Sequence, residues 1–388
     1  MTVCAREPAA QPRVEMLRGA GDVAAAEWDD LSRRGFHLHA WFLAAEKCGW
    51  EARHVAVRGA GGLDAIVPAY LTGAHNLNNL HDRWLGPLSR VTPGVALRPV
   101  ISVQSPFALV PDPLGDPAAL PPAILHRVLE RLEARAEADG AKAVAWPSVD
   151  EDNATLLHVA RERGYAVLYA GASARIQIQW ASFEDYVAGR SKSVRHTIKA
   201  DLEAARSAGL RTSVVSDFRA AAPEMTALYR QAFRRRNSRE APVPKEFFEE
   251  LSRHPTDRIR AQLTWSGERL VGTSVNLNTR QLLEGTFGAF APEHRAGPAY
   301  FNDLFYEPIR LACREGIGAI DLGATALYAK ALRGATLRRR VILIRGTTRS
   351  RHAVIRAIGE LVARRTEWKE RRALGPLWAP HLSAGSEP

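Results

Sequence analysis

Two separate stretches of the sequence show the same order of predicted elements, and this repetition constrains the fold more than any other feature. In the first, a helix containing "WFLAAE" precedes a predicted hairpin, "HVAVRGAGGLDAIVPA". In the second, a helix containing "EFFEEL" precedes the hairpin "RAQLTWSGERLVGTSV". Leu63 and Leu270 occupy matching places in the hairpins, 207 positions apart. The repetition predicts a tandem duplication, with one domain over 13–175 and a second over 176–388.

Length and composition fit two globular domains, each with its own core. The 388 residues are 46% hydrophobic and 24% charged, and no apolar run approaches the roughly 20 residues that span a bilayer. The first residues lack the basic start and apolar stretch of a signal peptide. Cys4, Cys48 and Cys313 are too widely separated to predict a disulfide framework or a metal site. We therefore expect a cytoplasmic protein without a membrane span or a bound metal.

Most of the net charge of +11 lies in one C-terminal segment. Between Arg333 and Arg372 there are twelve arginines and one lysine against three glutamates, a balance of +10. Such a segment could simply be a set of solvated surface helices. It could also be a docking face for a polyphosphate, with a folded RNA as the most plausible partner.

Four local patterns bear on a functional site. Residues 258–292 alternate as a three-stranded meander. A basic helix is predicted from Ser191, a capping residue, to Gly209. A helix begins near Pro298, with a kink expected at Pro308. After it, "AIDLGATALYAKALRG" predicts a buried strand that ends in a small-residue loop.

The order of helix, hairpin, third strand, glycine-opened helix and strand resembles that of the GNAT acyltransferase fold. The stretch "EHRAGPAYFNDLF" is similar to the GNAT pyrophosphate loop. Gly297 and Ala299 match its last two fixed positions, whereas His294 stands where glutamine or arginine is usual, and Arg295 comes one place late. Independently of the family, a helix N-terminus opened by small residues offers free N–H groups to an anion.

The wider chain resembles the Fem-like branch of tandem GNAT proteins, which includes aminoacyl-tRNA-dependent transferases and acyltransferases of secondary metabolism. The resemblance rests on "FHLHAWFLAAEKCGWEARHVAV", "SKSVRHTIKADLEAARSAGL" and "GIGAIDLGATALYAKALRG". It implies an α/β fold of two GNAT-like domains, each with a mixed, mostly antiparallel sheet flanked by helices. In one departure, Ala329 separates the tyrosine and lysine that usual members place side by side.

Amide formation by direct attack of an amine on an acyl carbonyl needs groups that hold the oxygen and move protons. Lys330, just past a strand end, is the main candidate for the oxyanion or donor phosphate, with Tyr328 as a general acid. Glu284 on the third meander strand is a candidate base, and Asp321 could face the cleft or the solvent. Each could also be an ordinary surface or packing residue.

Further residues are candidates for binding the two substrates. His294, Arg295, Gly297, Ala299 and Arg333 are expected to hold the donor. Gly297 and Lys330 should then line one cleft. Asp82, Trp84 and Asn276 are candidate contacts to the acceptor.

The basic helix carries Lys192, Arg195 and Lys199 on one face, because they are spaced by three and four residues. Together with Arg338, Arg339 and Arg340 they are candidate RNA contacts.

The sequence thus predicts an N-acyltransferase with no cofactor beyond its co-substrate. The basic segment and the Fem-like resemblance favour transfer from an aminoacyl-tRNA to an amine of a small metabolite or peptide. The partial glycine loop favours an acyl-coenzyme A donor instead. A tandem GNAT protein that binds without catalysis is the third possibility.

Overall fold

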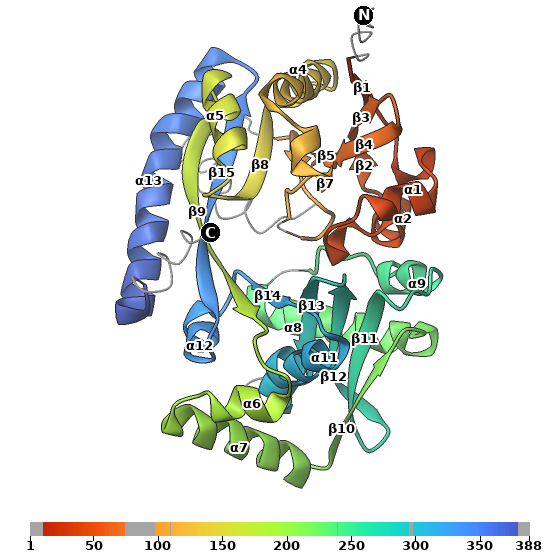
Figure 1. Ribbon diagram of the computed structural model, residues 1–388, viewed down its shortest axis with the longest axis vertical. Helices are drawn as coiled ribbons and strands as arrows, with labels where there is room; N and C mark the ends of the chain where they lie inside the picture. Colours follow the sequence, from red (N-terminus) through yellow and green to blue (C-terminus); the bar gives the residue numbers. More distant parts are fainter. Residues whose placement is uncertain (1–10, 74–97, 109, 239, 295–297, 379–388) are drawn as a thin grey trace, which may run out of the picture.

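The computed structural model describes residues 11–73, 98–108, 110–238, 240–294 and 298–378. Eleven of the described strands form one large sheet through both halves of the molecule, and four short strands form a small sheet beside it (Figure 1). The large sheet follows the order β10 (Leu210–Val215), β11 (Ile259–Ser266), β12 (Arg269–Asn278), β13 (Leu282–Phe290), β14 (Ala319–Gly323), β9 (Ala166–Gln177), β15 (Thr336–Gly346), β8 (Ala143–Asp150), β6 (Val100–Val103), β5 (Ala69–Thr72) and β2 (Glu51–Ala52).

The small sheet belongs to the N-terminal half. Its order is β1 (Arg13–Met16), β3 (Val55–Gly59), β4 (Gly62–Val67) and β7 (Leu114–Gly115). In both sheets only the pairs β13/β14 and β6/β8 run parallel among the described strands. The predicted α/β class with mostly antiparallel pairing is therefore confirmed.

Helices cover the sheets in both halves (Figure 1). In the N-terminal half they are η1 (Ala20–Asp22), α1 (Ala25–Asp30), η2 (Gly35–His37), α2 (His39–Lys47), η4 (Pro117–Ala119), α4 (Pro122–Ala138) and α5 (Ala154–Glu162). Later in the chain come α6 (Phe183–Ala188), α7 (Lys192–Ser207), η5 (Arg219–Ala221), α8 (Ala222–Asn237), α9 (Phe247–Ser252), η6 (Pro292–His294), α10 (Pro298–Phe301), the π-helix η7 (Asn302–Tyr306), α11 (Glu307–Glu315), α12 (Leu327–Leu332), α13 (Arg349–Leu374) and η8 (Gly375–Leu377).

The repeated element order is present in the structure. In the first stretch α2 precedes the hairpin β3/β4, and in the second α9 precedes the hairpin β11/β12. The basic helix is α7, and the Ser191 hydroxyl accepts a hydrogen bond from the backbone N–H of Val194. These helices and strands form where the sequence shows the matching apolar periodicity and capping residues.

Two long strands join the halves into one sheet. β9 lies between β14 of the second half and β15, while β15 lies between β9 and β8. Helix α13, at the C-terminal end of the described chain, packs on β9 and β15 (Figure 1). The last strand and helix therefore complete the N-terminal half, and the predicted boundary at residues 175–176 falls close to the end of β9.

Two local features differ in detail from the pattern in the sequence. The residues after β14, expected as a loop, form the short helix α12, which buries Leu327 and Ala331. The helix expected to kink at Pro308 contains the π-helix η7 directly before α11, where Pro308 is the second residue. Proline lacks the N–H that would bond the carbonyl four residues earlier, which explains a widened turn at this point.

Gly35 lies where the two halves meet, and we predict that it cannot be replaced without loss of stability. A Cβ at Gly35 would lie 2.6 Å from the carbonyl carbon of Leu277 on β12. Backbone cannot yield as a side chain does, so Gly35→Ala should lower the free energy of unfolding by about 1–3 kcal/mol. Gly21→Ala is the matched control, because nothing lies within 4 Å of its Cβ position. Equal denaturant midpoints for both variants would contradict the prediction.

Candidate active site

A cavity opens where strands β13 and β14 separate. They pair in parallel only through Leu282–Ala319, Leu283–Ile320 and Glu284–Asp321, and then diverge. The cavity between them has a volume of about 540 Å³. We call it the strand-split cavity. Its lining includes Gly285, Thr286, Phe287 and Gly288 from β13, Asp321, Leu322 and Gly323 from β14, Tyr300, Asp303, Leu304 and Phe305 from the covering helix, and Asn276 and Lys330.

Lys330 points its ammonium at the end of β14. The side chain is only 5% exposed, and its Nζ donates to the carbonyl oxygens of Leu322 at 2.5 Å and Gly323 at 3.3 Å. An ammonium has three N–H groups, so one stays available to a ligand in the strand-split cavity. Burial lowers the pKa of Lys330 to about 8, although the negative charge of Asp321 opposes this shift. Lys330 can therefore exchange a proton near neutral pH.

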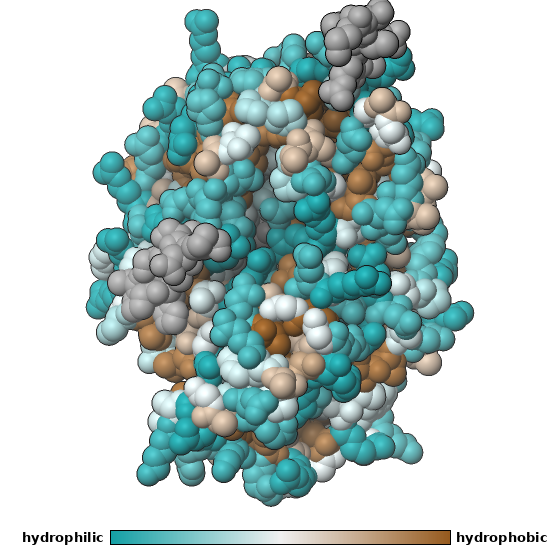
Figure 2. Space-filling view, in the orientation of Figure 1, coloured by the Kyte–Doolittle hydropathy of each residue, from teal (hydrophilic) through white to brown (hydrophobic). Residues whose placement is uncertain are grey.

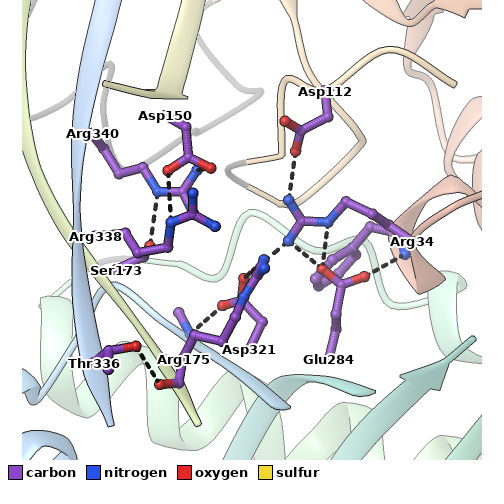
Figure 3. A network of polar contacts seen from close by, with 12 residues as sticks. Arg34, Asp112, Asp150, Ser173, Arg175, Glu284, Asp321, Thr336, Arg338 and Arg340 are labelled. Carbon is purple, nitrogen blue, oxygen red and sulfur yellow. Dashed lines mark hydrogen bonds and ion pairs between the residues drawn. The ribbon is translucent and has the colours of Figure 1, made fainter. Parts of the chain in front are cut away.

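An arginine whose side chain is 12% exposed links the two halves beside this cavity. Arg34, between α1 and η2, donates from Nη2 to Glu284 at 2.5 Å and to Asp321 at 3.0 Å (Figure 3). Its Nη1 pairs with Asp112 at 2.5 Å. The backbone N–H of Phe36 adds a bond of 3.1 Å to the second oxygen of Glu284. One guanidinium thus holds three carboxylates from distant parts of the chain.

The two predicted carboxylates differ in character. Glu284 is 1% exposed, and burial raises its pKa above the usual value even though Arg34 opposes this. Burial would also raise the pKa of Asp321, but Arg34, Arg340 and Arg175 outweigh it and hold that pKa below the usual value. Asp321 lines the strand-split cavity, whereas Glu284 is enclosed by Arg34 and Phe36. Asp321 is therefore the carboxylate placed to meet a ligand.

A second cavity of about 560 Å³ lies on the other side of this network. We call it the junction cavity, because residues of both halves line it. They include Arg33, Arg34, His37, Asp112, Asp150, Arg175, Gln281, Leu282 and Arg338. Arg34 lines the junction cavity and contacts Asp321, which lines the strand-split cavity. The ion pairs of Asp321 with Arg34 and Arg175 therefore lie between the two cavities. Figure 2 shows that the face in view is mostly hydrophilic and is hollowed between the upper and lower parts of the molecule.

Several buried polar atoms of the junction cavity have no hydrogen-bond partner. They are both ring nitrogens of His37 and Nε of Arg175. Burial, reinforced by Arg34, lowers the pKa of His37 to about 3, so its imidazole is neutral. Unpaired buried polar groups are costly, and a polar ligand in the cavity would supply their partners.

The predicted donor-binding residues are only partly described. His294 is the last residue of η6 and is partly exposed. Arg295 and Gly297 lie outside the described residues, so the expected meeting of Gly297 with Lys330 stays a prediction. Ala299 lies in α10 by its backbone. Arg333 is buried, with its guanidinium 3.9 Å from the ring centre of Phe301 and 3.5 Å from Asp201.

The remaining candidates are divided between the strand-split cavity and the surface. Asn276 is buried, lines the cavity and donates to Gln262 at 3.3 Å. Tyr328 is 53% exposed and is not among the lining residues of either cavity. Asp82 and Trp84 lie outside the described residues. The structure therefore brings Lys330, Asp321 and Asn276 together and leaves Tyr328 apart.

The basic residues fall into two groups. On α7, Lys192 and Lys199 are exposed, and Arg195 is partly exposed and donates to the carbonyl oxygen of Arg190 at 2.6 Å. The second group differs from the expected exposed cluster because it lies in β15, inside the large sheet. Its ion pairs join Arg338 to Asp150 and Asp152, Arg339 to Glu151 and Glu367, and Arg340, only 4% exposed, to Asp150.

Two further observations concern the part of the chain that the structure describes. No cluster of three or more histidine, cysteine, aspartate or glutamate side chains there is arranged to hold a metal ion. None of the helices described combines the length and the apolar character needed to cross a membrane.

Two important residues, Arg34 and Asp303, were not identified from the sequence. Arg34 is one of two adjacent arginines in a loop, and its partners Glu284 and Asp321 lie 250 and 287 positions away. No local pattern reports such a distant pairing. Asp303 was also missed, although an acidic residue among the apolar residues of "AYFNDLFY" is a visible signal.

The buried ammonium of Lys330 predicts a pH-dependent stability. The pKa of Lys330 falls from an ordinary 10.5 to about 8 in the folded state. The folded state then bears the full cost of burying the charge below pH 8, about 3 kcal/mol. This cost fades as the pH rises from 8 to 10.5. The free energy of unfolding of the wild type should therefore rise relative to that of Lys330→Met over this range. Lys199→Met, at an exposed site, should show no such change, and parallel profiles for all three proteins would contradict the prediction.

Comparisons with known proteins identify the family of this chain. A family model, FemAB-like, described as peptidoglycan biosynthesis/recognition, matches residues 20–356. A search of curated proteins finds no match to the sequence.

Among solved structures, FemX is similar with a TM-score of 0.56 and 12% identity, over 85% of this chain and 96% of FemX. The C-terminal domain of a putative lysylphosphatidylglycerol synthetase from Agrobacterium fabrum has the same score and identity, over 87% and 94%. A tandem GNAT protein from the clavulanic acid biosynthesis pathway scores 0.50 at 12% identity, over 87% and 99%. These similarities confirm the tandem GNAT-like fold. The chain therefore belongs to the FemAB-like family, and it is an acyltransferase.

Proposed function

We propose that the protein transfers an aminoacyl group from aminoacyl-tRNA to an amine, with the acyl group in the strand-split cavity and the acceptor in the junction cavity. The observation that carries this proposal is the position of Asp321 between the cavities, where it pairs with Arg34 and Arg175 of the junction cavity. Lys330 lies on the donor side of this pair and the unpaired polar atoms of the junction cavity lie on the other. A donor and an acceptor bound in these places would meet at Asp321.

The residues account for the steps of amide formation. The acceptor amine attacks the acyl carbonyl, the carbonyl oxygen becomes an oxyanion, and the ester bond to the ribose oxygen breaks. The free N–H of Lys330 can stabilise the oxyanion. With its pKa near 8, Lys330 can also give a proton to the departing oxygen and regain one from the amine. Asp321, an anion at neutral pH, orients the attacking amine.

The junction cavity fits a polar acceptor. It offers the cations Arg33, Arg34, Arg175 and Arg338, the carboxylates Asp112 and Asp150, and the neutral imidazole of His37. FemX belongs to the neighbours with this fold, and the family description refers to peptidoglycan. We therefore propose an acceptor that carries an amine together with anionic or polar groups, as a peptidoglycan precursor does.

The exposed face of α13 supports a tRNA donor more than the arginines of β15 do. Helix α13 spans 26 residues, about 39 Å at 1.5 Å per residue. Seven cations on it are exposed against one exposed carboxylate, Glu360. The cations are Arg349, Arg356, Arg364, Arg365, Lys369, Arg371 and Arg372. A helix of this length with an excess of exposed cations suits the phosphate backbone of a folded RNA. An acyl-coenzyme A donor would need no such surface.

The first test compares donors directly. Purified protein is incubated with charged tRNA or with acyl-coenzyme A and candidate amines, and amide products are detected by mass. We expect product with charged tRNA, and none after RNase treatment. Product formation from acyl-coenzyme A that RNase leaves unchanged would replace the tRNA donor with the thioester.

Lys330→Ala separates an enzyme from a binding protein. We expect turnover to fall at least a hundredfold, because removing one oxyanion donor typically costs 10²–10³ in kcat. Lys245→Ala is the control, since it removes an exposed lysine from the same half. Circular dichroism checks that both variants stay folded. A Lys330→Ala protein with wild-type turnover would show that Lys330 takes no part in chemistry.

The role of α13 has its own prediction. Arg364→Gln with Arg365→Gln should weaken tRNA binding and lower the slope of log affinity against log salt concentration by about 1 for each phosphate that the variant no longer neutralises. Arg131→Gln with Arg161→Gln removes two exposed arginines from α4 and α5 and serves as the matched control. Equal slopes for the two double variants in a filter-binding titration would exclude α13 as the docking surface.

A further inference from the structure

The sheet face beneath the π-helix η7 is polar although it is buried. Gln262 and Thr264 on β11 pair directly with Ser274 and Gly272 on β12, so their side chains share one face. Asn276 continues this face by alternation. Gln262, Thr264, Ser274 and Asn276 are each almost fully buried. The opposite face of the same strands carries apolar residues such as Leu263 and Val275, which belong to a hydrophobic core.

Asp303 lies on this polar face. It comes from η7, is 1% exposed and lines the strand-split cavity. Its Oδ2 accepts a bond of 2.5 Å from the Thr264 hydroxyl, and its Oδ1 accepts longer bonds from Asn302 and Thr212. Gly272 gives the carboxylate room, because a Cβ there would lie 3.0 Å from Oδ2. The glycine and the widened helical turn together let a carboxylate lie flat on the sheet.

The donors around Asp303 are neutral, which separates it from the other buried carboxylates of the site. Glu284 and Asp321 are each paired with Arg34, whereas among the described residues no lysine, arginine or histidine forms an ion pair with Asp303. Burial raises its pKa to about 6, so it is still an anion at neutral pH. The Ser274 hydroxyl, on the same face, has no hydrogen-bond partner. A buried anion that lines a cavity without a cationic partner points to a cationic ligand.

We propose that Asp303 is a specificity-determining residue of the strand-split cavity, and that it selects acyl groups that carry an ammonium. The ammonium would pair with the carboxylate and bond to the amide oxygen of Asn276, which also lines the cavity. An acetyl or fatty acyl group would bury the same carboxylate without a cation, at an energetic cost. This proposal rests on the proposed function only in placing the acyl group in the strand-split cavity, and it holds for any carrier of that group.

The test varies the acyl group and the carrier separately. Alanyl and propionyl groups differ by the ammonium alone, and each is presented on a tRNA acceptor-stem RNA and as a thioester of pantetheine. We expect the wild type to prefer alanyl by at least tenfold in kcat/KM. Asp303→Asn keeps the shape and should bring this ratio close to one, mainly through reduced alanyl turnover. Glu133→Gln, which alters a half-buried carboxylate paired with Arg163 and Arg345, is the control and should keep the wild-type ratio.

A binding measurement covers the case in which neither carrier supports turnover. Alaninamide and propionamide are compared by ligand-observed NMR with the wild type and with Asp303→Asn. Binding of alaninamide to the wild type alone supports the proposal. Equal binding of both amides, or a wild-type kcat/KM ratio near one on either carrier, overturns it. A preference for alanyl on pantetheine without any reaction on the RNA would instead disprove the tRNA donor and leave the role of Asp303 intact.

Discussion

The site depends on one buried guanidinium. Arg34 reaches from the N-terminal half to Glu284 on β13 and Asp321 on β14, at the row where these two strands last pair. A buried charge is tolerated only when its partners are well placed, and removal of one partner typically costs 3–5 kcal/mol. Arg34 therefore fixes the two halves relative to each other and, together with Arg340 and Arg175, keeps Asp321 ionised. The arrangement of the two cavities follows from this one interaction.

Local patterns predicted the elements well, and tertiary contacts decided the rest. The hairpins, the meander and the capped helix α7 follow from periodicity and turn residues over short windows. Lys330 and Asp321 could also be predicted from the sequence, because both lie within ten residues of a strand end. Arg34 and Asp112 could not, since their roles come from partners far along the chain. Asp303 stood out as an acidic residue in an apolar segment, but its place on the sheet depends on a widened helical turn. What limits prediction from the sequence is therefore the separation of interacting residues along the chain, rather than the type of residue.

The basic C-terminal segment shows how one composition serves two purposes. In β15 the three consecutive arginines sit beside Asp150, Glu151 and Asp152, so their charge is used inside the fold. In α13 the charge stays on the surface. A count of arginines cannot distinguish these environments, because the strand gains its partners only when it enters the sheet. The net charge of the exposed surface is what a polyanionic partner would meet.

The position of β15 has a consequence for how the chain is made. β8 and β9 both leave an unpaired edge until residues 336–346 have been inserted between them. During synthesis the N-terminal half must therefore wait, with two open strand edges, while nearly the whole second half emerges from the ribosome. Open edges of this kind favour aggregation and mispairing. A stop codon before β15 would release a chain in which the second half has all its strands but the N-terminal half lacks the strand that joins β8 to β9.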